Sequence, residues 1–472
     1  MNSQQTMAAT QRLLHTHRPA QGPLRVLSAS GQLGYGIPLA AFERGLQRKP
    51  HFIGCDMGSI DPGPYYLGSG EMAAPRDMVV RDLELVLGAA LALGVPLIIG
   101  SAGTAGARPQ LDATVDIVRA IAQDRSWTFR LTTISSDLSA EQVLEALRAD
   151  ALLPIGPMTR PTEAEVQACS HIVGQCGTET LVRALNEPTD VLIAGRACDT
   201  AIFAALPELL GYPPALCLHM AKIIECTSLC CRPGGRDSML AELDMDGFTL
   251  ESMNPDSHAT PASVAAHAMY EQADPFSVEE PSGTLQLGEA RYHAVDAHRT
   301  RVSGARFVPR TRPTLKIEGA SRVGARAVLI AGVADPTLLG MLPQALVAVE
   351  AKVRQLVPGT WSAYPHIYGQ GAVRALALAD RSLHEAGLVI EFIAKDAALA
   401  RTAAAVFKQN LLHHAYPGRV STAGNLAFAF TPSEIDANEA YRFVLYHVMQ
   451  DAPLDAIFGI DNFIVDGQTQ HG

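Results

Sequence analysis

The sequence has no excess of basic residues and no long apolar run. Its 37 Lys and Arg are outnumbered by 48 Asp and Glu, and the formal net charge is -11 at pH 7. That balance argues against a broad nucleic-acid surface, which needs clustered positive charge. No stretch reaches the roughly 18 uninterrupted apolar residues of a membrane span, and residues 1–23 lack the apolar core of a secretory signal. We therefore expect a cytoplasmic protein with no nucleic-acid or membrane partner, beginning with a disordered lead-in at 1–23.

Motifs that identify common enzyme classes are also absent. The sequence contains no G-x-S-x-G, H-E-x-x-H or Walker A motif and no set of protein-kinase motifs, which removes the simplest hydrolase, zinc-protease and P-loop predictions. The eight cysteines are scattered through a chain that is 48% hydrophobic, which favours reduced thiols over a disulfide framework. At 472 residues, the chain is long enough for two domains.

Apolar strands alternate with helices over roughly the first half of the chain. Because the apolar strands at 24–29, 95–100 and 190–195 do not alternate in polarity, they predict a parallel sheet covered on both faces. Residues 284–333 instead carry short alternating segments, including 314–318 and 327–332, which are typical of antiparallel strands. The expected fold is α/β, with a doubly wound, mostly parallel sheet in a Rossmann-like domain. We place this domain at 24–230 and an α+β domain at 231–472.

The segment at 52–70, FIGCDMGSIDPGPYYLGSG, has the strongest functional signal. A short apolar run breaks into Gly, Pro, Ser and Asp, so neither strand nor helix continues. This pattern predicts a buried strand that opens into an ordered loop, with Asp56, Ser59 and Asp61 at the mouth of the sheet. Ligands of open α/β sheets bind at that edge. The alternative interpretation is a structural loop with capped turns.

Other strand ends carry similar signals. The Gly-rich turn that begins at Ser30 and Gly31 presents backbone N–H groups that suit an anion, although its spacing is not G-x-G-x-x-G and a plain tight turn is the alternative. Ser101 opens a second small, Gly-rich segment. Arg196 and Asp199 follow a buried strand. Such an Arg either binds a carboxylate or phosphate through two N–H groups or pairs with the Asp to fasten the loop.

Candidate proton carriers lie in the middle of the chain. Lys222 and Glu225 are three residues apart on an expected helix, which is either an ordinary helix pair or a base with a tuned pKa. His258 lies just before another expected helix, and His267 and Glu271 share one face of that helix. These groups form a His–carboxylate acid/base unit or a solvated polar surface. We predict no metal ligands among the nearby cysteines, because their spacing is a weak metal signal.

Taken together, these segments resemble the AtuA-like family, named for acyclic terpene utilisation. The resemblance covers about residues 24–455 and is carried by SASG at 28–31, FIGCDMGSIDPGPY at 52–65, PLIIGSA at 96–102, VLIAGRACD at 191–199, MYE at 269–271, KIEGA at 316–320 and TAG at 422–424. It implies a cytosolic catabolic protein, encoded with enzymes that handle branched acyl-CoA compounds or carboxylic acids. Longer relatives carry a ferredoxin-like C-terminal domain, and shorter ones are accompanied by a separate small protein. We therefore expect a small ferredoxin-like companion subunit.

We accordingly predict a catabolic enzyme acting on a small organic acid or an acyl-CoA thioester, with hydratase, dehydratase (hydro-lyase) or isomerase chemistry. The candidate catalytic residues are Asp56, Asp61, Lys222, Glu225, His258 and His267. The candidate substrate-binding residues are Ser30, Gly31, Ser59, Ser101, Arg196 and Asp199. No cofactor is predicted, and a homo-oligomer is expected on general frequency.

Two alternatives stay open at this point. The first is a metal-assisted lyase in which Asp56 and Asp61 hold a divalent cation such as Mg²⁺. The second is a binding or scaffold subunit that is active only with the small companion protein.

Overall fold

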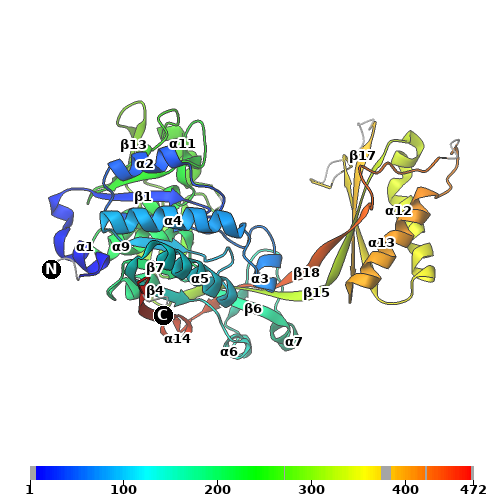
Figure 1. Ribbon diagram of the computed structural model, residues 1–472, viewed down its shortest axis with the longest axis horizontal. Coiled ribbons are helices and arrows are strands. Elements are labelled where there is room, and N and C mark those ends of the chain that lie inside the picture. Colours follow the sequence, from blue (N-terminus) through cyan, green and yellow to red (C-terminus); the bar gives the residue numbers. More distant parts are fainter. Residues whose placement is uncertain (1–6, 271, 371, 374–383, 420–422, 469–472) are drawn as a thin grey trace. The chain divides into compact units, whose positions relative to one another are not determined.

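The chain folds into two compact units. The computed structural model describes all residues except 1–6, 271, 371, 374–383, 420–422 and 469–472 (Figure 1). Unit 1 comprises residues 1–320 and 443–472, and unit 2 comprises residues 321–442. The expected division after residue 230 therefore falls inside unit 1. The physical reason is that β8 (Met239–Leu243) pairs with β1 (Leu24–Ser30), so one sheet continues past that point.

A ten-stranded mixed sheet forms the centre of unit 1, in the order β12-β13-β9-β8-β1-β2-β3-β7-β4-β19. Five neighbouring strands are parallel, as the apolar runs predicted: β1, β2 (Phe52–Asp56), β3 (Leu97–Gly100), β7 (Val191–Ala194) and β4 (Thr128–Ser135). Antiparallel strands extend the sheet on both sides: β8, β9 (Phe248–Ser252), β13 (Arg299–Ser303) and β12 (Arg291–Ala294) beyond β1, and β19 (Gly459–Asp466) beyond β4.

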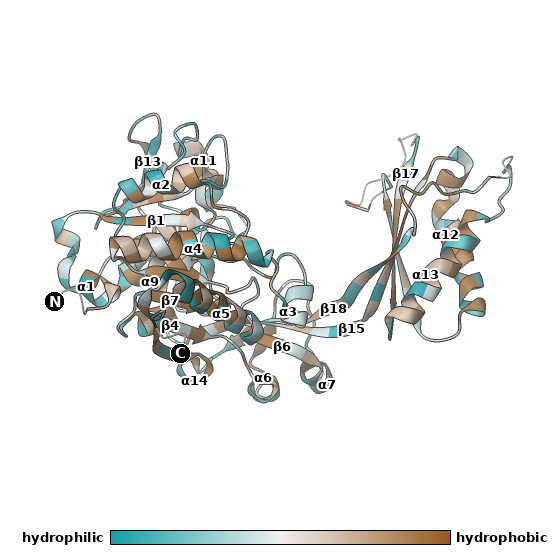
Figure 2. Ribbon diagram, viewed as in Figure 1, coloured by the Kyte–Doolittle hydropathy of each residue, from teal (hydrophilic) through white to brown (hydrophobic). Residues whose placement is uncertain are grey.

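Helices cover both faces of the parallel strands. One face packs against α2 (Leu39–Gln47), α4 (Arg76–Leu93) and α5 (Arg108–Arg125), and the other against α8 (Thr178–Leu185), α9 (Asp199–Leu209) and α10 (Pro214–Ile224). Successive residues such as Phe52 and Ile53 belong to opposite cores, and both are fully buried. Helix α9 is hydrophobic along most of its length in Figure 2. Burial on two faces explains why these strands show no polar alternation.

The segment before the sheet differs from the expectation. Residues 9–21 are ordered as α1 (Ala9–Thr16) and a 3-10 turn (Pro19–Gln21), so the predicted disordered lead-in is wrong for these residues. The backbone N–H of Ala9 donates to Asp190 Oδ1 at 2.7 Å, and Leu13 is buried in the core. The buried side of this short helix attaches it to the rest of unit 1. The polar composition of residues 1–23 as a whole gave no indication of this side.

The remaining elements of unit 1 surround the central sheet. Strands β5 (Leu152–Pro154) and β6 (Cys169–Gly174) pair with β18 (Glu434–Gln450) and β15 (Thr314–Val333) instead of joining the parallel strands. The other elements are α3 (Tyr65–Ser69), α6 (Ala140–Arg148), α7 (Glu163–Gln167), η2 (Thr227–Cys230), α11 (Pro261–Ala268), α14 (Leu454–Ile457) and a three-stranded antiparallel sheet of β10 (Ser277–Glu280), β11 (Gly283–Gln286) and β14 (Arg306–Pro309). No helix among the described residues is long and apolar enough to span a membrane.

Unit 2 has its own fold and core. The chain enters it within β15 and leaves it within β18. Between them lie α12 (Pro336–Leu356), β16 (Trp361–Tyr368), β17 (Ala386–Ala394) and α13 (Ala397–Leu412). The order of elements is β-α-β-β-α-β and the strand order is β16-β17-β15-β18, which is a ferredoxin-like arrangement. Both helices pack against the buried side of the sheet, which includes Leu388, Ile390 and Phe392.

A buried aspartate on α4 anchors the loop that follows β1. The Asp82 side chain is fully buried and accepts backbone N–H groups from Gly34 at 3.0 Å, Gly36 at 2.9 Å and Ile37 at 3.1 Å. Gly34 and Gly36 have φ values of +100° and +92°, which favour glycine. The backbone N–H groups of the Gly-rich turn therefore do bind a carboxyl group, as the sequence suggested. That group is the side chain of Asp82 and not a ligand.

We predict that Asp82→Asn lowers the free energy of unfolding by roughly 2–4 kcal/mol, because an amide replaces the buried charge that accepts these bonds. Urea unfolding measures the loss, and hydrogen exchange of the amides at 34–37 shows whether the loop opens. Asp77→Asn, on the exposed side of the same helix, is the matched control. An equal loss in both variants would contradict this assignment.

Candidate functional site

A cavity of about 310 Å³ opens where three of the parallel strands end. Its wall comes from the loops after β1, β2 and β7 and from the segment that follows α10. The lining residues are Ser30, Gly31, Gln32, Gly36, Asp56, Gly58, Ser59, Asp61, Asp199, Cys226, Thr227, Leu229, Arg236 and Tyr270. This is the edge at which open α/β sheets bind ligands. Six residues predicted from the strand ends lie on this wall: Ser30, Gly31, Asp56, Ser59, Asp61 and Asp199.

Asp56, the last residue of β2, presents one unpaired carboxyl oxygen. Its Oδ2 accepts the backbone N–H of Gly58 at 3.2 Å, and the N–H of Met57 also binds this carboxyl group. Its Oδ1 is buried and has no hydrogen-bond partner among the described residues. Burial raises the pKa of Asp56 well above its usual range, and the charge of Asp199 raises it further, while Arg196 opposes the shift. Asp56 therefore keeps its proton to a higher pH than an ordinary aspartate.

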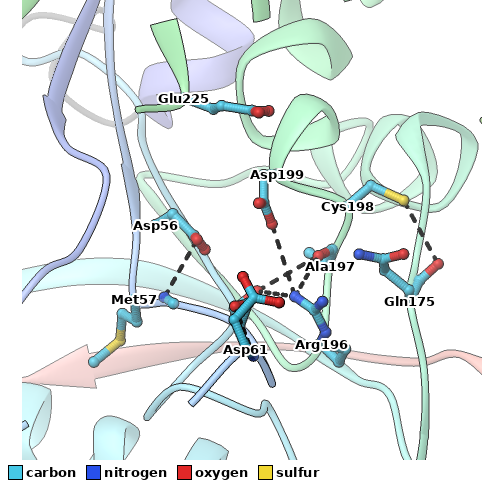
Figure 3. A network of polar contacts seen from close by, with 12 residues as sticks. Asp56, Met57, Asp61, Gln175, Arg196, Ala197, Cys198, Asp199 and Glu225 are labelled. Carbon is cyan, nitrogen blue, oxygen red and sulfur yellow. Dashed lines mark hydrogen bonds and ion pairs between the residues drawn. The ribbon is translucent and has the colours of Figure 1, made fainter. Parts of the chain in front are cut away.

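Asp199, the first residue of α9, forms the second carboxyl group of the cavity. Figure 3 shows Asp56, Asp61 and Asp199 with their carboxyl groups pointing toward a common space beside Arg196. Loss of water raises the pKa of Asp199, although 37% of its side chain stays exposed, and the nearby cation of Arg196 opposes the rise. A negative charge on Asp199 thus favours the protonated form of Asp56.

Arg196 lies behind the cavity wall and fastens its own loop. The side chain is only 3% exposed, and its Nε donates to Glu318 Oε2 at 2.9 Å. Its Nη1 donates to Ser101 Oγ at 3.1 Å and to the carbonyl oxygen of Ala197 at 3.2 Å. Glu318 is fully buried and also pairs with Lys316 at 3.2 Å. Arg196 Nη1 also lies 3.7 Å from Asp199 Oδ1, as in the loop-fastening alternative. Arg196 and Ser101 are not among the described lining residues.

Lys222 and Glu225 form a buried ion pair at the C-terminal end of α10. Lys222 Nζ lies 2.6 Å from Glu225 Oε1, and neither residue is on the cavity wall. Burial raises the pKa of Glu225 to about 8; the charge of Lys222 opposes this shift and that of Asp199 adds to it. The carbonyl oxygen of Glu225 would lie 2.5 Å from a Cβ at position 31, so only Gly31 allows the β1 loop to approach α10 this closely.

The two histidines predicted as proton carriers pack against other rings. His258 packs against the ring of His298 at 4.2 Å, and its Nε2 lies 3.2 Å from the carbonyl oxygen of Pro255. His267 is buried and stacks on Tyr270, and burial lowers its pKa to about 4. Neither histidine is on the cavity wall as described. Glu271, the expected partner of His267, lies outside the described residues.

Sequence reasoning missed part of the wall. Gln32, Thr227, Leu229 and Arg236 line the cavity but were not predicted as site residues. Three of them follow α10, where no strand end announces a ligand site. One sequence feature could have indicated that this segment lines a site. An apolar helix ends there abruptly before the sequence TSLCC at 227–231. Among the described residues, no group of three or more His, Cys, Asp or Glu side chains is arranged to hold a metal ion.

Three further carboxyl groups with shifted pKa values are largely buried in unit 1. Burial raises the pKa of Glu208 to about 8 and that of Glu280 to about 7, and it also raises the pKa of Glu179. Glu280 Oε1 accepts a hydrogen bond from the hydroxyl group of Thr200 at 2.9 Å. Thr200 directly follows Asp199 in the sequence. Glu208 Oε1 has no hydrogen-bond partner among the described residues. These groups come from α8, α9 and β10, so no local pattern announces them.

The pKa of Glu208, raised to about 8, means that this group keeps its proton in the folded chain at pH values where the unfolded chain has lost it. His267, whose pKa is lowered to about 4, acts in the opposite direction up to its ordinary value of 6.5. We predict that stability falls as pH rises from about 6.5 to 8 and that Glu208→Gln reduces this slope. One proton corresponds to about 1.4 kcal/mol per pH unit. Urea unfolding at intervals across that range measures the slope, with the exposed Glu187→Gln as control. An unchanged slope in Glu208→Gln would refute the prediction.

No family model matches the chain, and no curated protein and no solved structure matches it.

Proposed function

We propose that this chain is an enzyme that adds or removes water, or isomerises, beside the carbonyl group of a small organic acid or an acyl thioester. The observation that supports this proposal best is the pair of carboxyl groups on the cavity wall, Asp56 and Asp199. Each has a pKa raised above its usual range, and each has a buried oxygen that accepts no hydrogen bond among the described residues. We propose that the pair shares one proton, so that one carboxyl group acts as the acid and the other as the base.

The proposed step is a dehydration and its reverse. The ionised member of the pair takes the proton from the carbon next to the carbonyl. The protonated member gives its proton to the leaving hydroxyl group, so water departs and a carbon–carbon double bond forms. The pair then holds the same number of protons as before, with the proton on the other carboxyl group. An isomerisation would use the same pair, with the proton returned to a different carbon.

Several further features belong to the same proposal. The resemblance to the AtuA-like family at 52–65 and 191–199 supports a catabolic substrate, because both segments contribute to the cavity wall. We propose that unit 1 uses its strand ends as doubly wound sheets do. We also propose a cytoplasmic location and a homo-oligomer.

We predict that Asp56→Asn lowers kcat by about 100-fold or more, because an amide cannot carry the proton, and positioned acid/base groups contribute roughly 10²- to 10⁴-fold. A thermal-shift screen against organic acids and acyl-CoA thioesters identifies the substrate class first, since a ligand of the native state raises Tm. Turnover of the best ligand then compares Asp56→Asn and Asp199→Asn with the exposed control Asp124→Asn.

The other outcomes separate the alternatives. Full turnover in both Asp56→Asn and Asp199→Asn would show that the chemistry lies elsewhere. A thermal shift only with Mg²⁺ would favour a metal-assisted lyase that uses Asp56 and Asp61. Activity that appears only after addition of a small ferredoxin-like companion would favour the subunit alternative.

A further inference from the structure

The charges on the cavity wall are unevenly distributed. Three carboxyl side chains, those of Asp56, Asp61 and Asp199, line the space, and Arg236 is the one Lys or Arg side chain among the described lining residues. Two of the carboxyl groups have raised pKa values and so carry less negative charge than ordinary aspartates. A ligand anion near Arg236 therefore meets weaker repulsion than the count of acidic residues suggests.

Few groups of the protein bind the guanidinium of Arg236. Its Nη2 donates to the carbonyl oxygen of Gln32 at 3.3 Å, and its guanidinium lies 5.9 Å from the ring centre of Tyr35. It forms no ion pair with any residue that the structure describes. The neighbouring carboxylate, Asp237, is engaged by Asn254 Nδ2 at 2.9 Å. Since a guanidinium carries five N–H donors, most of its donors are available to a ligand.

The backbone on both sides of Arg236 is held in place. The N–H of Gly235 donates to the carbonyl oxygen of Ser228 at 3.1 Å, and the N–H of Asp237 donates to Ser228 Oγ at 2.8 Å. The N–H of Ser228 in turn donates to the carbonyl oxygen of Asp237 at 3.1 Å. Ser228 lies between two lining residues, Thr227 and Leu229. The segment that carries Arg236 is thus bonded directly to the cavity wall, which lowers the entropy lost when a ligand is bound.

We propose that Arg236 binds a carboxylate group of the substrate at this cavity, so that the substrate class is small carboxylic acids in their anionic form. This inference rests on the proposed function and narrows it. A guanidinium matches a carboxylate through two parallel N–H···O bonds. The cavity volume of about 310 Å³ suits a small acid. Bound in this way, the acid brings the carbons beside its carboxylate toward Asp56 and Asp199.

The test compares binding and turnover separately. Thermal shift and calorimetric titration of the full chain use short hydroxy and unsaturated carboxylic acids and their matched uncharged amides. We expect the acids to bind and the amides to bind at least tenfold more weakly. Arg236→Gln should raise Kd and KM for the acid by roughly 10- to 100-fold, as for the loss of a charged hydrogen-bond donor, with a smaller change in kcat. Arg236→Lys should recover part of the loss.

Arg232→Gln is the matched control, because Arg232 is exposed on the same segment and is not a lining residue. Equal binding of acids and amides, no binding of any acid, or unchanged Kd in Arg236→Gln would overturn the assignment of Arg236. If only Arg236→Gln is unchanged, while Asp56→Asn still abolishes turnover, the proposed function survives. If Arg236→Gln loses binding but Asp56→Asn and Asp199→Asn both turn over normally, the anion site stands and the proposed acid/base pair fails.

Discussion

Burial of the parallel strands on both faces is the constraint on which unit 1 depends. Helices cover β1, β2, β3, β7 and β4 on each side, so most side chains along these strands are buried. Charged side chains with access to solvent are concentrated where the strands end, and there the chain turns into loops rich in Gly, Ser and Asp. The cavity with Asp56 and Asp199 therefore lies at the edge of the sheet as a direct result of how the core is packed.

A second constraint is the placement of charge inside the protein. Arg196 and Glu318 are both buried, and their contact at 2.9 Å offsets the cost of removing two charges from water. Lys316 gives the Glu318 carboxylate a second cation, and together the two cations lower the pKa of Glu318 against the effect of burial. Asp199 lies 3.7 Å from Arg196 Nη1, but for Asp56 and Asp199 the effect of burial outweighs that of the nearby cations, so their pKa values rise. Arg196, Glu318 and Lys316 thus form an ion-pair network inside the protein. The pKa values of Asp56 and Asp199 are instead raised toward the range in which they exchange protons.

The sequence predicted those parts of the fold and site that are encoded locally. Apolar runs located β1, β3 and β7 to within a few residues, and polar residues at or shortly after strand ends, such as Asp56 and Asp199, do line the cavity. Contacts between distant segments could not be predicted. The orientation of Arg196 depends on Glu318, which is 122 residues away. Arg236 lies in an irregular segment without a periodic signal.

The division of the chain into units was hidden for a different reason. Strand β15 runs for 20 residues, but Gly319 and Gly324 interrupt its apolar pattern, so it reads as two short segments at 314–318 and 327–332. The boundary between the units at residues 320 and 321 falls inside this strand. A method that seeks boundaries in linkers cannot find one within an element of regular structure.

The position of β19 has a consequence for synthesis on the ribosome. Strand β4 pairs with β19 along its whole length, and the bond between Thr128 and Asp466 joins residues 338 positions apart. All of unit 2 is translated between these two strands. The β4 edge of the large sheet thus stays without its partner strand until residues 459–466 have emerged, and unpaired backbone groups at such an edge favour association with other chains. The connectivity therefore delays closure of that edge until after unit 2 has been made.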